Sequence, residues 1–379
     1  MIIDVKDLKS NMLIDEDLYN NQGGLIVPKG FPSTNTAQLM KLLENNGISK
    51  IKVLLLPNSG AADENIEEMA SSSDNEDKKS FFETNKAFFE DKKEQEVSEF
   101  LENFTDSVDS FQKEIQNSVL GKGQKNNIIL LLWDNINKDA ETETNLFQLL
   151  QKLKDSDDYT FLHSSSVALV ANKIGQWLQL GEDDLYDLSI AALLSDVGKT
   201  SIPKDILSKP SQLTSEEYDK VKKHVEESLK IVESYGFNEN IVNSVKYHHE
   251  RCDGSGYPLG LKYEQIPLNS RIIAIADVFV ALTSKRPHRD KMTPFEAVSV
   301  LETEYMQKLD IIILSEFVKH IAKSYIGSPV KLSNGQTGKI VFINKLFPLR
   351  PIVQIDGENG ELIDLSSKEN LELKITEFF

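Results

Sequence analysis

The sequence has little cysteine, no long apolar run and no leader-like start. Its one cysteine, Cys252, has no partner for an internal disulfide, which is typical of proteins in a reducing cytoplasm. The longest apolar runs are short, such as residues 128–133 (IILLLW), whereas a membrane span needs about 20 apolar residues. The first 12 residues lack the basic start and apolar stretch of a signal peptide. We therefore predict a cytoplasmic protein without a membrane span.

Positive charge is also scarce. The chain has 42 Lys and Arg residues against 60 Asp and Glu residues, a formal net charge of −18. This balance argues against nonspecific binding of nucleic acid, whose phosphates attract basic surfaces. A small anionic ligand remains compatible, because a local cluster of basic side chains can oppose the field of the whole molecule.

The N-terminal part predicts a small α/β domain over residues 1–57. It contains an apolar strand with a glycine turn and a proline at 23–30, a helix over 36–46 capped by Gly47, and an apolar strand at 53–56. Residues 58–80 are acidic and Ser-rich, which predicts a flexible linker because such a segment buries little apolar surface. A segment that binds a basic partner is the alternative.

Residues 81–142 predict a helical connector with one apolar stripe. Spacings of four and three relate the members of this stripe, which are Val97, Leu101, Phe104, Val108, Phe111 and Ile115. We expect the helix to pack on its own chain. A dimeric coiled coil, and with it a homodimer, is the alternative, and fewer than three heptads are present to decide between them.

The remaining chain divides into a helical and a β part. Residues 143–325 have helical apolar spacing without strand alternation, which predicts an all-helical domain. In residues 326–379, alternating apolar residues flank Asn334-Gly335, a strong hairpin signal, and predict a small β-barrel or sheet. The predicted fold class is therefore mainly α, with a small α/β domain before the helices and a small β module after them.

Four of the six histidines lie in the helical part near two aspartates, and these six residues are His163, Asp196, His224, His248, His249 and Asp277. Taken singly, each has a structural explanation; His163, for example, shares an apolar helix face with Val167. The adjacent pair His248-His249 is harder to explain by packing. Imidazole and carboxylate are the usual ligands of Fe, Mn and Zn, and a carboxylate can bridge two metals that act on a phosphoryl group.

Residues 248–267 (HHERCDGSGYPLGLKYEQIP) resemble the signature of HD-GYP phosphodiesterases. The resemblance continues through residues 193–214 and 271–289, and it covers roughly residues 160–320. It implies an all-helical, metal-dependent domain of the type that hydrolyses cyclic di-GMP. Residues 1–56 and 326–379 resemble flanking modules of some family members, although less specifically.

The resemblance implies roles for individual residues. The six histidines and aspartates named above match metal ligands of the family, and Asp196 and Lys199 match catalytic positions, with the lysine against the scissile phosphate. The implied ligand-binding residues are Lys199, Gly256, Tyr257, Pro258, Arg286 and Arg289. Arginine suits a phosphate because its planar group donates two parallel hydrogen bonds.

The sequence departs from the family pattern at four positions. Ser195 precedes Asp196 where the family has histidine, and Val280 stands where an aspartate is usual. Tyr159 occupies a position that some members give to a metal-binding glutamate, and His288 replaces a common tyrosine. A serine hydroxyl is a poor substitute for imidazole at a transition metal.

The losses affect the two implied metal positions unequally. One keeps only His163, Asp196 and Asp277, while the other keeps Asp196, His224, His248 and His249. We therefore expect one Fe, Mn or Zn ion per chain, or fewer. The predicted function is a signalling protein with impaired phosphodiester hydrolysis, which binds cyclic di-GMP or a protein partner. The alternative is an active cyclic di-GMP phosphodiesterase with an altered metal site, and a third reading is an interaction protein without a ligand.

Overall fold

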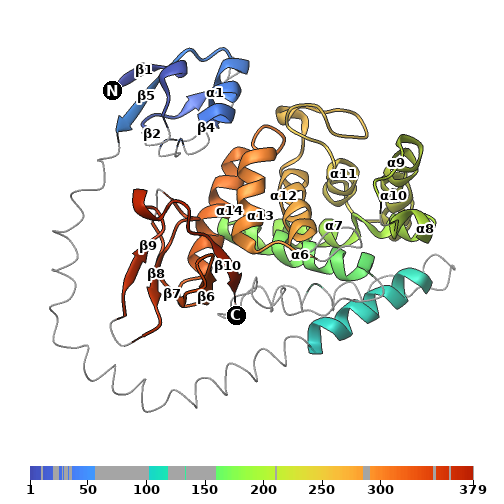
Figure 1. Cartoon of the computed structure of the whole chain (residues 1–379). Helices are drawn as coiled ribbons and strands as arrows, with labels where there is room; N and C mark the ends of the chain where they lie inside the picture. Colours follow the sequence, from blue (N-terminus) through green and yellow to red (C-terminus); the bar gives the residue numbers. More distant parts are fainter. Residues whose placement is uncertain are drawn as a thin grey trace.

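The structure is a computed structural model that describes most of the chain. The described residues are 1–9, 12–19, 25–27, 29, 33, 36–55, 102–117, 133, 159–209, 211–284, 291–344, 347–357 and 360–378. Figure 1 shows a helical body, with a small α/β unit beside one end and a group of strands beside another.

The N-terminal unit is a sheet covered by one helix. Strand β5 (Lys50–Leu55) is central and pairs antiparallel with β1 (Ile2–Asp4) and β2 (Met12–Ile14), and α1 (Thr36–Asn45) precedes it. Gly47 follows that helix with φ 74°, which is the left-handed conformation that a glycine cap supplies. The remaining elements are the 3₁₀ turn η1 (Val5–Asp7) and the strand pair β3 (Leu18–Tyr19) and β4 (Leu25–Val27).

The body is helical throughout its described part. Its elements are α6 (Tyr159–Trp177), α7 (Glu182–Leu194), η2 (Val197–Ser201), α8 (Lys204–Leu207), α9 (Ser215–Lys222), α10 (His224–Tyr235), α11 (Glu239–Tyr247), η3 (Tyr263–Gln265), α12 (Leu268–Thr283), α13 (Pro294–Glu304) and α14 (Ile311–Ser324). Side chains fix several starts: Thr214 and Thr293 form capping boxes, and Asn238 and Asp310 accept hydrogen bonds from the first turns that follow them.

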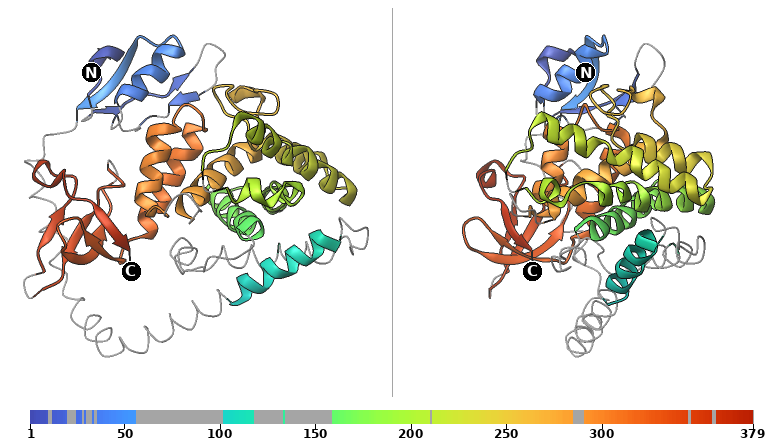
Figure 2. Two further views of the ribbon diagram at one scale, coloured as in Figure 1. Left: turned by 45° about the vertical axis from the view of Figure 1, so that its right-hand side comes forward. Right: turned by 90° about the vertical axis from the view of Figure 1, so that its right-hand side faces the viewer.

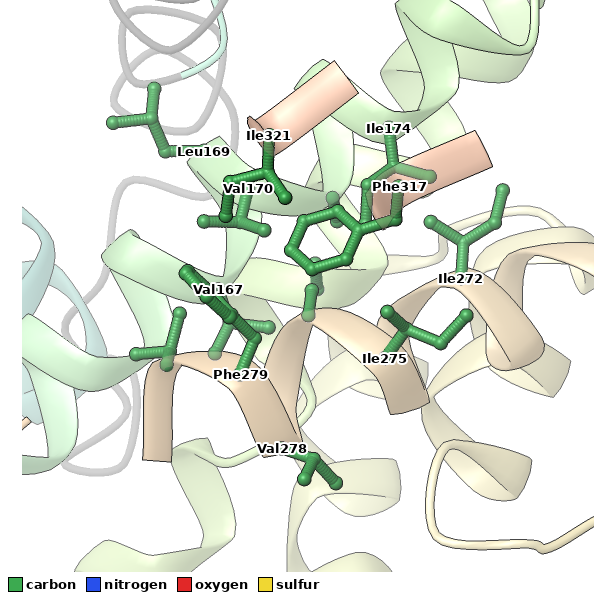
Figure 3. Packing of buried hydrophobic residues seen from close by; sticks show 14 of the residues in the cluster. Val167, Leu169, Val170, Ile174, Ile272, Ile275, Val278, Phe279, Phe317 and Ile321 are labelled. Atoms are coloured by element: carbon green, nitrogen blue, oxygen red, sulfur yellow. The ribbon is translucent and has the colours of Figure 1, made fainter. Parts of the chain in front are cut away.

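Helices α6, α12 and α14 meet in the main hydrophobic core. Figure 3 shows Phe317 of α14 between residues of α6 and α12, including Ile174 and Phe279. The rings of Phe317 and Phe279 lie 5.1 Å apart in an edge-to-face arrangement, which adds to the gain from burial. Since α6 and α12 also carry two of the aspartate and histidine candidates, this packing fixes the distance between those candidates.

A helix over residues 102–117 packs on the same core. Phe104, Val108, Phe111 and Ile115 are all buried in it, and the rings of Phe111 and Phe161 lie 5.3 Å apart. The predicted apolar stripe thus contacts the protein's own helices. Val97 and Leu101 lie outside the described residues.

The C-terminal strands form a five-stranded sheet in the order β10-β6-β7-β8-β9. The strands are β6 (Pro329–Leu332), β7 (Thr337–Phe342), β8 (Ile352–Ile355), β9 (Leu362–Asp364) and β10 (Ile375–Phe378), with η4 (Lys368–Asn370) before the last. The predicted hairpin at Asn334-Gly335 joins β6 to β7, and Gly335 has φ 88°. Buried residues of these strands, such as Val330 and Ile340, belong to the same core as the helices. The predicted fold class is therefore confirmed.

Within the described residues, no helix combines the length and the apolar composition that crossing a membrane requires.

Candidate metal centre

Six side chains from separate parts of the helical body converge on one place. His163 lies on α6, Asp196 follows α7, His224 begins α10, and Asp277 lies on α12. His248 and His249 directly follow α11. All six are thus held at helix ends or within helices, which fixes their backbone positions.

The six residues form two groups that share one carboxylate. Asp196, His224, His248 and His249 can each offer one atom within 4.8 Å of the others, and so can His163, Asp196 and Asp277. These are the same two sets that the sequence resemblance implies. Asp196 is the shared member, so its two oxygens could serve both groups.

The hydrogen bonds of His224 and His248 determine which ring nitrogen faces the site. Nδ1 of His224 lies 2.6 Å from the carbonyl oxygen of Val221, and Nδ1 of His248 lies 2.6 Å from that of Val245. A carbonyl can only accept, so each Nδ1 carries the proton. In the neutral rings, both Nε2 atoms then present lone pairs to the site, as metal-binding histidines do.

Three buried atoms at this point have no hydrogen-bond partner: Asp196 Oδ1, His224 Nε2 and His248 Nε2. His224 Nε2 lies 3.2 Å from Asp196 Oδ1. Burial lowers the pKa of His224, which favours the neutral ring, and two acceptors then face each other. Such an arrangement is costly without a cation, so the residues fit a divalent metal.

The second group is tighter and includes a positive charge. His163 Nε2 lies 3.0 Å from Asp277 Oδ1 and 3.5 Å from Asp196 Oδ2. Lys199 Nζ lies 2.6 Å from the same Asp196 oxygen. Burial alone would raise the pKa of Asp196, but the combined interactions with Lys199, His224 and His248 outweigh it and hold this pKa well below its usual value. Asp196 is therefore an anion.

Tyr257 covers the histidine side of the site. Its ring lies 4.7 Å from that of His249, tilted by 31°, and its backbone N–H donates to His249 O. Burial lowers the pKa of His249 well below the usual histidine value, so this ring too is neutral. Tyr218 of α9 meets the edge of Tyr257 at 6.4 Å, so two aromatic rings lie beside the metal-binding candidates.

A glycine and a serine bring Asp196 close to His224. A Cβ atom at Gly198 would lie 2.1 Å from His224 O and 2.5 Å from Ser228 N, so only glycine allows η2 to approach α10 this closely. The Ser228 hydroxyl donates to Ser195 O and accepts from Gly198 N, both at 2.8 Å. Neither Gly198 nor Ser228 was identified from the sequence. Of the two, only Gly198 offered a signal, because a glycine stands two residues after Asp196.

Glu250 organises the loop that carries Tyr257. Its buried carboxylate accepts hydrogen bonds from Leu259 N at 2.7 Å and Leu261 N at 2.8 Å. A Cβ atom at Gly256 would lie 2.3 Å from Arg251 N, so the loop folds back on itself only with glycine there. The sequence motif contained Glu250 but did not reveal its supporting role.

At the positions that depart from the family pattern, no described side chain is among the grouped metal-binding candidates. The Ser195 hydroxyl donates to Ala192 O at 2.9 Å, and Val280 is 3% exposed in the hydrophobic core. The side chain of Tyr159 is not among those described. Arg286, His288 and Arg289 lie outside the described residues.

The helical region is similar to known proteins. A family model described as an HD domain matches residues 148–313. Cyclic di-GMP phosphodiesterase PA4108 of Pseudomonas aeruginosa is 32% identical over 225 residues, which are 59% of this chain and 54% of that protein. The 3′3′-cGAMP-specific phosphodiesterase 1 of Vibrio cholerae is 36% identical over 44% of this chain and 39% of its own length.

A cyclic di-GMP phosphodiesterase of Thermotoga maritima is 35% identical over 43% of this chain and 46% of its own length. The chain thus spans about half the length, or less, of these relatives. Among solved structures, Bd1817, an HDG"Y"P protein from Bdellovibrio bacteriovorus, has a TM-score of 0.49 and 16% identity over 84% of this chain and 97% of that chain. A likeness that distant is no guide to function.

The helical region thus matches the model of an HD domain over residues 148–313 and is similar to phosphodiesterases named for cyclic dinucleotides. The motif that contains Gly256-Tyr257-Pro258 lies within the matched residues.

Proposed function

We propose that the helical region is an HD-GYP domain that binds a cyclic dinucleotide at the centre around Asp196 and hydrolyses it poorly. The observation that carries the proposal is the convergence of three partnerless buried atoms, Asp196 Oδ1, His224 Nε2 and His248 Nε2. Relatives of this domain carry names that specify cyclic di-GMP or 3′3′-cGAMP, so a cyclic dinucleotide is the expected ligand class. Cyclic di-GMP is the first candidate.

His224, His248, His249 and Asp196 would hold one Fe, Mn or Zn ion. A bound metal would supply Lewis-acid polarisation of a phosphoryl oxygen. Lys199 contributes positive charge beside Asp196, which attracts a phosphate group. Tyr257 presents an aromatic face beside His249, which suits contact with a nucleotide. On the basis of the sequence resemblance, we also propose that Arg286 and Arg289 bind the phosphates of the ligand.

Impaired hydrolysis follows from the weaker second group. His163, Asp196 and Asp277 supply three ligand atoms, and the Ser195 hydroxyl is engaged with Ala192 O. A site with one metal lacks the pair that stabilises both the attacking and the leaving oxygen. Binding thus persists where turnover is reduced, and the molecule acts as a sensor of its ligand or through a protein partner.

An active phosphodiesterase is the second candidate. The observation that favours it is that His163, Asp196 and Asp277 remain within ligand distance of one another despite the change at Ser195. Such an enzyme would hold two metals.

Calorimetric titration with cyclic di-GMP and with 3′3′-cGAMP tests the binding proposal. We expect binding of at least one of them, and a strong, salt-dependent loss in the variant Arg286→Ala/Arg289→Ala. Each charge-assisted hydrogen bond to a phosphate contributes about 1.5–3 kcal/mol. Absence of binding at high micromolar ligand would leave the interaction protein as the better reading.

A further inference from the structure

The turn between α13 and α14 completes the core of the N-terminal unit. Met306 and Ile311 are 4% and 7% exposed, and they share one buried cluster with residues of that unit such as Leu39. Ile312 packs against the same cluster, and α14 contacts β4. Figures 1 and 2 both show the N-terminal unit beside the start of α14. The α/β unit therefore rests on this turn.

The same turn holds the loop that follows the paired histidines. Cys252, three residues after His249, donates its N–H to Lys308 O at 2.8 Å. Tyr263 at the end of the loop donates its N–H to Cys252 O at 3.3 Å. The loop that carries Glu250 and Tyr257 is thus anchored on residue 308.

An ion pair reinforces this anchor. Arg271 of α12 pairs with Asp310, which is 2% exposed, and its guanidinium lies 4.6 Å from the centre of the Tyr263 ring. Asp310 Oδ1 also accepts from Ile312 N at 2.9 Å and from Ile313 N at 3.3 Å. One carboxylate therefore joins the start of α14 to α12 and, through Tyr263, to the loop.

Backbone hydrogen bonds close the turn. Lys308 N and Leu309 N both donate to Tyr305 O at 2.9 Å, so Met306 and Lys308 lie in one hydrogen-bonded turn that leads directly into Asp310. We therefore expect a displacement of Met306, which contacts the N-terminal unit, to displace Lys308, which holds the loop.

We propose that residues 305–312, through Lys308 O and the Arg271–Asp310 pair, are the positioning link by which the N-terminal unit sets the placement of His248 and His249. The inference rests on the proposed metal centre and assigns its regulation. Coupling of this kind is reciprocal. Docking of the N-terminal unit raises the metal affinity of the site, and metal binding in turn strengthens the docking.

The matched variants are Met306→Ala/Ile311→Ala and Ile313→Ala, both in the full chain. Ile313 lies on the same helix as Ile311 but belongs to the main core instead. Hydrogen exchange is followed at loop amides with hydrogen bonds, which are those of Cys252, Tyr257, Leu259, Leu261 and Tyr263. Mn²⁺ titration measures the affinity of the site.

We expect the double variant to exchange faster at these loop amides and to bind Mn²⁺ about 2- to 30-fold more weakly, the range for substitutions along a coupled network. Ile313→Ala should lower the melting temperature without this selective loss. Unchanged loop exchange and Mn²⁺ affinity in the double variant, with the N-terminal amides exposed, would overturn the link.

Asp310→Asn tests the ion pair separately from the helix cap, because asparagine retains a capping oxygen but loses the charge that faces Arg271. We expect faster loop exchange in Asp310→Asn and in Arg271→Gln, and a smaller effect in Arg271→Lys. Equal exchange in Arg271→Gln and the parent would contradict the role of the pair.

Failure of the link is distinguishable from failure of the proposed function. If the parent chain binds no Mn²⁺, Zn²⁺ or Fe²⁺, the metal centre is wrong, while the exchange data still decide whether the turn positions the loop. If the parent binds metal, added Mn²⁺ should slow hydrogen exchange of the amides in β5 and α1. Exchange that Mn²⁺ leaves unchanged would contradict the reciprocal coupling.

Discussion

The hydroxyl of Ser195 donates a hydrogen bond to the backbone carbonyl of Ala192, 2.9 Å away and one turn back along α7. The neighbouring Asp196 carboxylate faces His163, His224 and Lys199. The side chain of Ser195 therefore forms a hydrogen bond within the last turn of α7, whereas the side chain of Asp196 lies at the centre of the candidate metal site.

Replacing Ser195 with histidine should raise the metal content of the protein. An imidazole at this position would add a ligand beside Asp196, and Val280→Asp restores the aspartate that the family resemblance implies, one turn after Asp277 on α12. Because Ser195 is 4% exposed and Val280 is 3% exposed, the larger or charged side chains will also cost stability by overpacking or desolvation, by about 1–3 kcal/mol each. Elemental analysis and a thermal melt of the same samples check both expectations.

The combined variant should gain more metal than the two single variants together, because residues at one cluster rarely act additively. A folded double variant that holds no more metal than the parent would show that residue 195 is not the limiting position.

Asp196→Asn should abolish metal binding at both groups. The shared carboxylate is lost, and even partners outside the ligand set typically change metal affinity by about 10–100-fold, so the decrease should exceed about 100-fold. Asp187→Asn is the matched control, since that buried carboxylate accepts hydrogen bonds from Asn238 and Asn240, away from the metal-binding candidates. We expect it to reduce stability by about 1–3 kcal/mol and to leave metal affinity unchanged. Equal metal affinities for the two variants would contradict the assignment.

The metal-free protein should lose stability as the pH falls below about 6.5. Burial lowers the folded-state pKa values of His224 and His249 below the usual histidine value of about 6.5, so the unfolded chain takes up protons first. Between the two pKa values the unfolded state binds more protons, and the free energy of unfolding therefore decreases as pH decreases. Thermal melts between pH 7.5 and pH 5.5 measure this slope. His249→Asn should flatten it, and an unchanged slope would show that the pKa of this ring is the same in the folded and the unfolded protein.

Gly256→Ala should disrupt the loop over the site. The new Cβ would lie 2.3 Å from Arg251 N and 2.4 Å from Glu250 Cα, and these backbone atoms can only move if the loop opens. Gly236→Ala is the control, because its φ of +73° is strained for alanine but its surroundings are open. It should cost about 1–2 kcal/mol of stability without loss of ligand binding. Calorimetry with cyclic di-GMP compares ligand binding by the two variants. Intact binding by Gly256→Ala would argue against a role of the loop in ligand binding.

The helices and the hairpin were predictable from the sequence because each rests on local spacing. The stripe that includes Phe104 and Phe111 is buried as its periodicity predicts, and Asn334-Gly335 forms the expected turn. The grouping of His163, Asp196 and Asp277 needed the family resemblance, since their separation in the chain carries no local signal.

The supports of the site were not predictable, for a physical reason. Ser228 and Glu250 act on backbone N–H and carbonyl groups, as in the bonds to Ser195 O and Leu259 N. Such contacts leave no pattern in side-chain spacing. Likewise, nothing local to Met306 and Ile311 shows that they complete the core of a unit that lies more than 250 residues earlier in the chain.

The most direct test of the account measures metal content and cyclic di-GMP hydrolysis on the same anaerobically purified protein, beside Ser195→His. We predict about one Fe, Mn or Zn ion per chain or fewer, slow or absent hydrolysis, and an increase of both in the variant. Two tightly held metals in the parent, with hydrolysis that Ser195→His does not improve, would contradict impaired catalysis and make the protein an active phosphodiesterase.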